Sequence, residues 1–119
     1  MSYLQPSVIY FTHSNINFKF TGCGKLLEET LNEIIVGKTS VEDIPKIKVF
    51  YTYEDGIIKY FSENNRRLWV FKQLEKLKLL DTIVVRLEKT NNKKYIKNTY
   101  ALDAKIKKKH KRYLDLSEI

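Results

Sequence analysis

The chain has 119 residues, of which 43% are hydrophobic and 13% aromatic. This length supports one hydrophobic core, and this composition excludes wholesale disorder. The formal net charge of +8 is unevenly distributed, because residues 1–88 hold 12 Lys/Arg against 11 Asp/Glu and residues 89–119 hold 10 against 3. We therefore predict one domain over 1–88 and a basic C-terminal extension over 89–119. The extension suits a polyanion such as nucleic acid, an acidic protein or an anionic membrane surface, and a merely solvated tail is the alternative.

The sequence has no feature of a membrane or secreted protein. It has no run of about 18 apolar residues, and its first residues lack the basic and apolar regions of a secretory signal. The single cysteine, Cys23, cannot form an internal disulfide, which agrees with a reducing compartment. We expect an intracellular protein, cytoplasmic or nuclear, without a transmembrane segment.

The first half of the chain predicts a strand, a helix and a hairpin. The β-branched and aromatic run at 7–12 is typical of a buried strand. Apolar residues then recur at helical spacing over 25–36, and Gly37 is a suitable stop. Alternating residues over 46–53 and a strand-like run over 57–61 flank Asp-Gly, which is a strong hairpin signal. A further helical turn is predicted at 41–44.

The second half predicts a helix and a last strand. Apolar spacing indicates a helix over 64–77, and the Thr-Ile-Val-Val composition of 81–87 indicates a buried strand. A basic helix over 99–116 is predicted with few apolar residues to anchor it, so its formation can depend on a partner. This order predicts an α+β fold, with a small mixed β-sheet covered by helices.

The most informative stretch is the polar turn that joins the predicted strand at 57–61 to the following helix. It reads Ser62-Glu63-Asn64-Asn65-Arg66-Arg67. A helix N-terminus binds anions through its unpaired N–H groups and its dipole, and guanidiniums add planar donors. The turn therefore predicts a phosphate site. The structural alternative is that a polar residue caps the helix while the arginines pair with a carboxylate such as Glu63. The single Trp, at position 69, is expected in the core.

This stretch resembles the central motif of the ParB/sulfiredoxin superfamily, in which a strand leads into a Gly-Glu-Arg-Arg or Gly-Gly-Cys-His-Arg turn that cradles nucleotide phosphates. The resemblance covers roughly residues 8–88, and its specific match is about a dozen positions around the turn. It implies that Arg66 and Arg67 bind phosphate, and that a nucleoside di- or triphosphate with Mg²⁺ is the cofactor. Lys19 is a candidate second phosphate contact.

Position 65 departs from both families that the motif resembles. Asn65 stands where sulfiredoxins carry their cysteine nucleophile and where ParB proteins carry a metal-binding Glu. Glu63 is the candidate substitute for that Glu. The resemblance therefore implies nucleotide or phosphate binding by Ser62, Asn64, Asn65, Arg66, Arg67 and Lys19, and it leaves open whether a reaction is catalysed.

Two other functions remain open from the residues. The first is a non-enzymatic nucleic-acid-binding module that uses the same turn and a basic tail. The second is a redox or transfer enzyme that uses Cys23, with His13 as its partner. Two His and one Cys are too few for a closed zinc site, so we predict no structural metal. The tail candidates for nucleic acid are Lys105, Lys107, Lys108, Lys109, Lys111 and Arg112.

Overall fold

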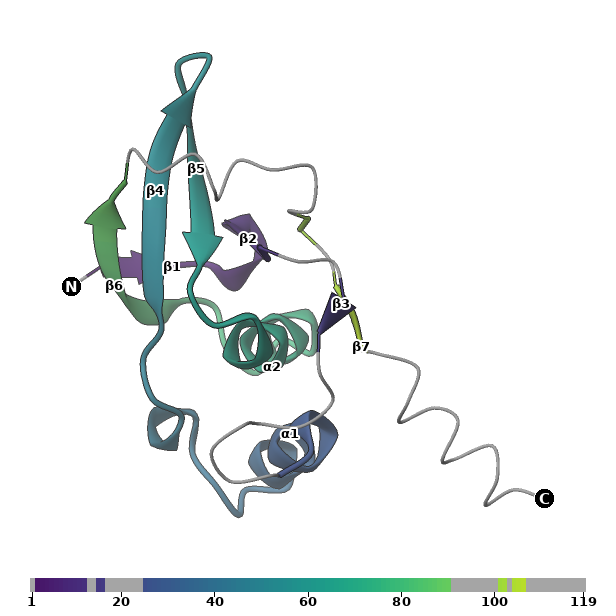
Figure 1. Ribbon diagram of the computed structural model, residues 1–119. Helices are drawn as coiled ribbons and strands as arrows, with labels where there is room; N and C mark the ends of the chain where they lie inside the picture. Colours follow the sequence, from purple (N-terminus) through teal and green to yellow (C-terminus); the bar gives the residue numbers. More distant parts are fainter. Residues whose placement is uncertain (1, 13–14, 17–24, 91–100, 103, 107–119) are drawn as a thin grey trace.

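The structure is a computed structural model that describes residues 2–12, 15–16, 25–90, 101–102 and 104–106. A five-stranded mixed sheet, helix α2 and helix α1 follow one another as layers (Figure 1). The α+β class predicted from the sequence is confirmed. The sheet strands are β1 (Ser2–Leu4), β2 (Ile9–Tyr10), β4 (Lys48–Glu54), β5 (Ile57–Ser62) and β6 (Ile83–Lys89); the helices are α1 (Leu27–Ile35) and α2 (Asn65–Lys76).

The strand order in the sheet is β1-β6-β4-β5-β2. Strands β4 and β5 form an antiparallel hairpin, which projects beyond its neighbours (Figure 1). Strand β6 runs parallel to β4, and β2 runs parallel to β5. A separate two-stranded pair joins β3 (Asn15–Ile16) to β7 (Lys105–Ile106) in parallel. The starts of β4 and β6 therefore lie at the same end of the sheet as the end of β5, where α2 begins.

The predicted hairpin is confirmed, and its turn follows from two residues. Asp55 has a φ of 52° and Gly56 a φ of 78°. Positive φ at both central residues is the type I′ geometry that suits the twist of a two-residue hairpin. Asp tolerates this conformation and Gly adopts it without a Cβ penalty. The local sequence is therefore sufficient to set the hairpin.

The core lies between α2 and the sheet face that α2 covers. Alternation along β4 directs Val49 to this face, and Val85 of β6 is directed in the same way. Trp69 packs against the core and is partly buried, as predicted. The buried core members are Ile9, Phe11, Ile44, Ile47, Val49, Leu68, Val70, Phe71, Leu74, Ile83 and Val85.

The N-terminal segment differs from its prediction. The strand expected over 7–12 is reduced to Ile9–Tyr10, and Pro6–Val8 forms a 3₁₀ turn. Pro6 favours the first position of such a turn, and the Ser7 backbone N–H and hydroxyl both donate to the Glu75 carboxylate, at 2.7 and 3.0 Å. The short strand β1 was not predicted, because three residues carry too little alternation to be read.

The C-terminal segment also differs, within the residues that the structure describes. A helix was predicted over 99–116, but Lys105–Ile106 is a strand, and Ala101 pairs with Phe11 through backbone hydrogen bonds of 2.7 and 3.0 Å. These pairings use the backbone groups that a helix would use internally. Lys72 of α2, only 5% exposed, donates to the Leu102 carbonyl at 2.7 Å and holds this segment against α2. The remainder of the predicted helix lies outside the described residues.

No helix in the described ranges has the length and apolar character needed to cross a bilayer.

Candidate anion site at the start of helix α2

Strand β5 is followed, after two residues, by the first turn of α2 (Figure 1). Ser62, the last residue of β5, is completely buried. Its hydroxyl accepts from the Asn64 N–H at 3.0 Å and donates to the Asn64 carbonyl at 2.9 Å. The Ser62 side chain is therefore engaged in shaping the turn, which a small hydroxyl does well because it bonds to nearby backbone.

Asn64 is the N-cap of α2. Its backbone is extended, with φ −123° and ψ 100°, and its Oδ1 accepts from the Arg67 N–H at 2.9 Å. A capping side chain satisfies one of the four N–H groups that a helix start leaves without intrahelical partners. The sequence analysis gave helix capping by a polar residue as the structural alternative, and Asn64 confirms that a polar side chain caps α2.

Asn65 connects α2 to the end of β2. Its Oδ1 accepts from the Thr12 N–H at 2.9 Å, and its Nδ2 donates to the Thr12 hydroxyl at 2.9 Å. The two residues are 53 positions apart in the chain. The side-chain amide of Asn65 supplies an acceptor for the Thr12 N–H and a donor for the Thr12 hydroxyl. Asn65 therefore positions the helix start against β2.

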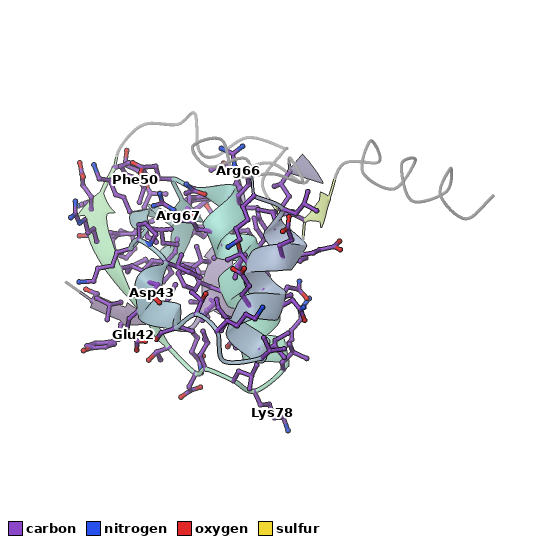
Figure 2. The ribbon with its side chains drawn as sticks, turned by 90° about the horizontal axis from the view of Figure 1, so that it is seen from below. Glu42, Asp43, Phe50, Arg66, Arg67 and Lys78 are labelled. Atoms are coloured by element: carbon purple, nitrogen blue, oxygen red, sulfur yellow. The ribbon has the colours of Figure 1, made fainter. Side chains whose placement is uncertain are left out.

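Arg66 and Arg67 occupy the second and third helical positions. The Arg67 guanidinium donates to the Lys46 carbonyl at 3.4 Å, so it reaches the segment just before β4. The described residues show no ion pair between Arg67 and Glu63, although the sequence offered that pairing. In Figure 2 the side chains of Arg66 and Arg67 lie on the same side of the molecule, with Phe50 beyond Arg67.

Glu63 is exposed, and its backbone N–H donates to the Lys48 carbonyl at 2.9 Å. This bond ties the turn to the start of β4. Within the described ranges, no three His, Cys, Asp or Glu side chains gather in a way that could hold a metal ion. Glu63 stands alone in the turn as a carboxylate.

Three basic residues near the turn were missed by sequence reasoning. Lys48 begins β4, and its register partner on β6 is Arg86, whose N–H donates to the Ile47 carbonyl at 3.0 Å. Lys46 is exposed beside them. Their proximity depends on pairing between strands that are more than 30 positions apart, so no local motif marks it.

The remaining predicted site residues lie outside the part of the chain that the structure describes. Among the turn and catalytic candidates these are His13, Lys19 and Cys23. Lys105 lies in β7, but its side chain is not described. The other tail candidates also lie outside the described residues; they are Lys107, Lys108, Lys109, Lys111 and Arg112.

Comparisons with protein-family models, with curated proteins and with solved structures gave no match. The fold and the site define a small α+β domain with a basic patch at one end of its sheet.

Proposed function

We propose that this chain is a phosphate-binding domain of ParB/sulfiredoxin type, which holds a nucleotide or another phosphorylated ligand at the start of α2. The observation that supports this most is the placement of Arg66 and Arg67 in the first turn of a helix that directly follows a strand. Arg67 and Lys46 meet there, at 3.4 Å from guanidinium to carbonyl. This contact holds the Arg67 side chain against the backbone of the segment that precedes β4.

Electrostatics favour an anion at this place. The positive end of the helix dipole makes adjacent cations locally unfavourable, and a bound phosphate offsets both charges. Guanidiniums also match phosphate oxygens with paired, charge-assisted donors. Because Asn64 and Asn65 bond to protein groups, their role in this proposal is to fix the turn. The ligand contacts are assigned to Arg66 and Arg67.

A nucleoside di- or triphosphate with Mg²⁺ fits this arrangement. Mg²⁺ bound to a nucleotide takes most of its ligands from phosphate oxygens and water, so the protein need supply only one carboxylate or none. Glu63 is the carboxylate of the turn itself. No catalytic step is assigned to any residue.

Thermal unfolding tests the proposal, with the fluorescence of Trp69, the single tryptophan, as the readout. Pyrophosphate, ADP, ATP, GTP and CTP are added separately, with and without Mg²⁺. A ligand at about 100 times its Kd stabilises the fold by about 2.7 kcal/mol, or roughly 10 °C in a domain of this size. We expect the shift to disappear in Arg67→Ala and to persist in Lys78→Ala, which removes an exposed cation on the opposite side of the view in Figure 2. No shift with any of these ligands, or an equal shift in Arg67→Ala, refutes the proposal.

The second candidate function is a nucleic-acid-binding module. It is favoured by one observation, namely that the basic residues Lys48 of β4 and Arg86 of β6 are register partners in neighbouring strands.

A further inference from the structure

One peptide group links the start of α2 to the C-terminal segment. It is the peptide bond between Phe11 and Thr12, and both of its polar atoms make long-range hydrogen bonds. Its carbonyl accepts from the Ala101 N–H at 3.0 Å, and its N–H donates to Oδ1 of Asn65, the first residue of α2, at 2.9 Å. A peptide group is planar and rigid, and a carbonyl that accepts a hydrogen bond polarises the attached N–H into a better donor. The two hydrogen bonds therefore strengthen each other.

The same C-terminal segment contacts α2 again, two turns further along the helix. The Lys72 ammonium donates to the Leu102 carbonyl at 2.7 Å and lies 5.0 Å from the centre of the Phe11 ring. Lys72 is seven positions after Asn65, so both residues lie on one face of the helix. This face of α2 therefore binds Thr12 at its start and Leu102 further along.

Residues 101–102 and 104–106 are called the C-terminal strap below, and they are held by backbone pairing. Ala101 exchanges two hydrogen bonds with Phe11, and β7 pairs with β3 apart from the main sheet (Figure 1). Leu102 is 43% exposed, and Ala104 is only partly buried against the core. Segments that bury few apolar side chains open at a lower free energy than the core does. The strap can therefore leave α2 while the sheet and both helices stay folded.

We propose that docking of the C-terminal strap controls the affinity of the anion site at the start of α2. This inference rests on the proposed phosphate-binding function and adds its regulation. When the strap is docked, the peptide between Phe11 and Thr12 is fixed and holds Asn65, so the first turn that carries the two arginines is ordered. When the strap leaves, the hydrogen bond from Ala101 is lost, the bond to Asn65 weakens, and this turn loses order. Linkage between two sites is reciprocal, so a bound anion strengthens docking of the strap by the same factor.

Amide hydrogen exchange of the full chain, with and without saturating pyrophosphate, measures this factor. The Ala101 N–H reports on the strap, and the control is the Lys78 N–H, which donates to the Glu75 carbonyl at the other end of α2. We expect pyrophosphate to slow exchange at Ala101 by about 5- to 150-fold, the usual range of coupling between linked sites, and to leave Lys78 unchanged. Without ligand, Ala101 should exchange faster than Leu74, which is buried in the interior of α2, because the strap opens locally.

The double variant Lys72→Met/Ala101→Pro tests the coupling from the side of the strap. It removes the bond from Lys72 to Leu102 and the N–H that Ala101 donates to Phe11, and neither changed residue is a proposed ligand contact. We expect titration calorimetry to show that it binds pyrophosphate about 5- to 150-fold more weakly than the native chain. The matched control is Ser7→Ala, which removes a hydroxyl bond to Glu75 and so loosens a different segment from α2. This control should bind pyrophosphate as the native chain does, and circular dichroism and the Tm establish that both variants are folded.

Three results overturn the inference and leave the proposed function standing. The first is that pyrophosphate binds but does not slow exchange at Ala101, or slows it no more than at Lys78. The second is that Ala101 exchanges at the rate of Leu74, because the strap then does not open separately. The third is that the folded double variant binds pyrophosphate as tightly as Ser7→Ala does; if the double variant does not fold, exchange in the native chain decides. No saturable effect of pyrophosphate on the native chain refutes the proposed function and the inference together.

Discussion

Substitutions of Asn65 can distinguish a structural role of the start of α2 from a ligand-binding role. Asn65→Ala removes two hydrogen bonds of 2.9 Å to Thr12 and leaves the partly buried Thr12 N–H without its acceptor. Each bond contributes a net 0.5–1.5 kcal/mol, and an unsatisfied buried donor costs about 1–3 kcal/mol. We therefore expect unfolding free energy to fall by about 2–3 kcal/mol. Urea unfolding followed by Trp69 fluorescence and by far-ultraviolet circular dichroism measures this change.

The matched variant is Asn65→Asp. Its carboxylate still accepts from the Thr12 N–H, and the Thr12 hydroxyl can rotate to donate to the second oxygen. A negative charge at the helix start is also favourable. We expect a stability within about 1 kcal/mol of the native chain. The same charge lies beside Arg66 and Arg67, so we expect anion binding to be lost.

The reasoning is refuted if Asn65→Asp destabilises the fold as much as Asn65→Ala does, because the acceptor role would then be unimportant. It is also refuted if Asn65→Ala is neutral in urea. Arg67→Ala with unchanged stability and lost binding is the complementary result that we expect.

Three further changes have defined outcomes. Gly56→Ala should lower the free energy of unfolding in urea by about 1 kcal/mol. The new Cβ has no heavy atom within 4 Å, so this cost comes from the φ of 78° alone. An unchanged free energy of unfolding would contradict the type I′ turn. Lys72→Met removes the buried bond to the Leu102 carbonyl and should cost about 2 kcal/mol, with faster amide exchange at Ala101; unchanged exchange there contradicts the role of Lys72. A hydrogen bond from the Ser40 hydroxyl, and to a smaller extent one from the backbone, lowers the pKa of Glu42. The stability that this carboxylate contributes is therefore present above its pKa in the unfolded chain and is lost as the pH falls through its pKa in the folded chain. Ser40→Ala should raise the Glu42 pKa in an NMR titration, and an unmoved midpoint would contradict this cause.

The parts of the fold that were predictable are those set by neighbouring residues. Asp55-Gly56 determines its hairpin, and the helix predicted over 64–77 is observed as Asn65–Lys76. The cap at Asn64 is likewise local, because its acceptor bonds three residues ahead. In each case the conformational preference and the hydrogen-bond partner lie within one turn of the chain.

The parts that were not predictable depend on contacts between distant segments. Asn65 has its partner at Thr12, and the pairing of Lys48 with Arg86 follows from the register of β4 and β6. In the C-terminal segment, the local sequence pattern favours a helix, but Lys105–Ile106 forms a strand that pairs with β3. A weakly apolar helix has little to hold it, so tertiary hydrogen bonds prevail.

The most direct test of phosphate binding at the start of α2 is a two-dimensional ¹H–¹⁵N NMR titration with sodium pyrophosphate at constant ionic strength. The proposal predicts that the largest shifts occur at the amides of residues 65–68 and 46–48, and that they saturate together. Shifts confined to other residues, or no saturable shift at all, would contradict it.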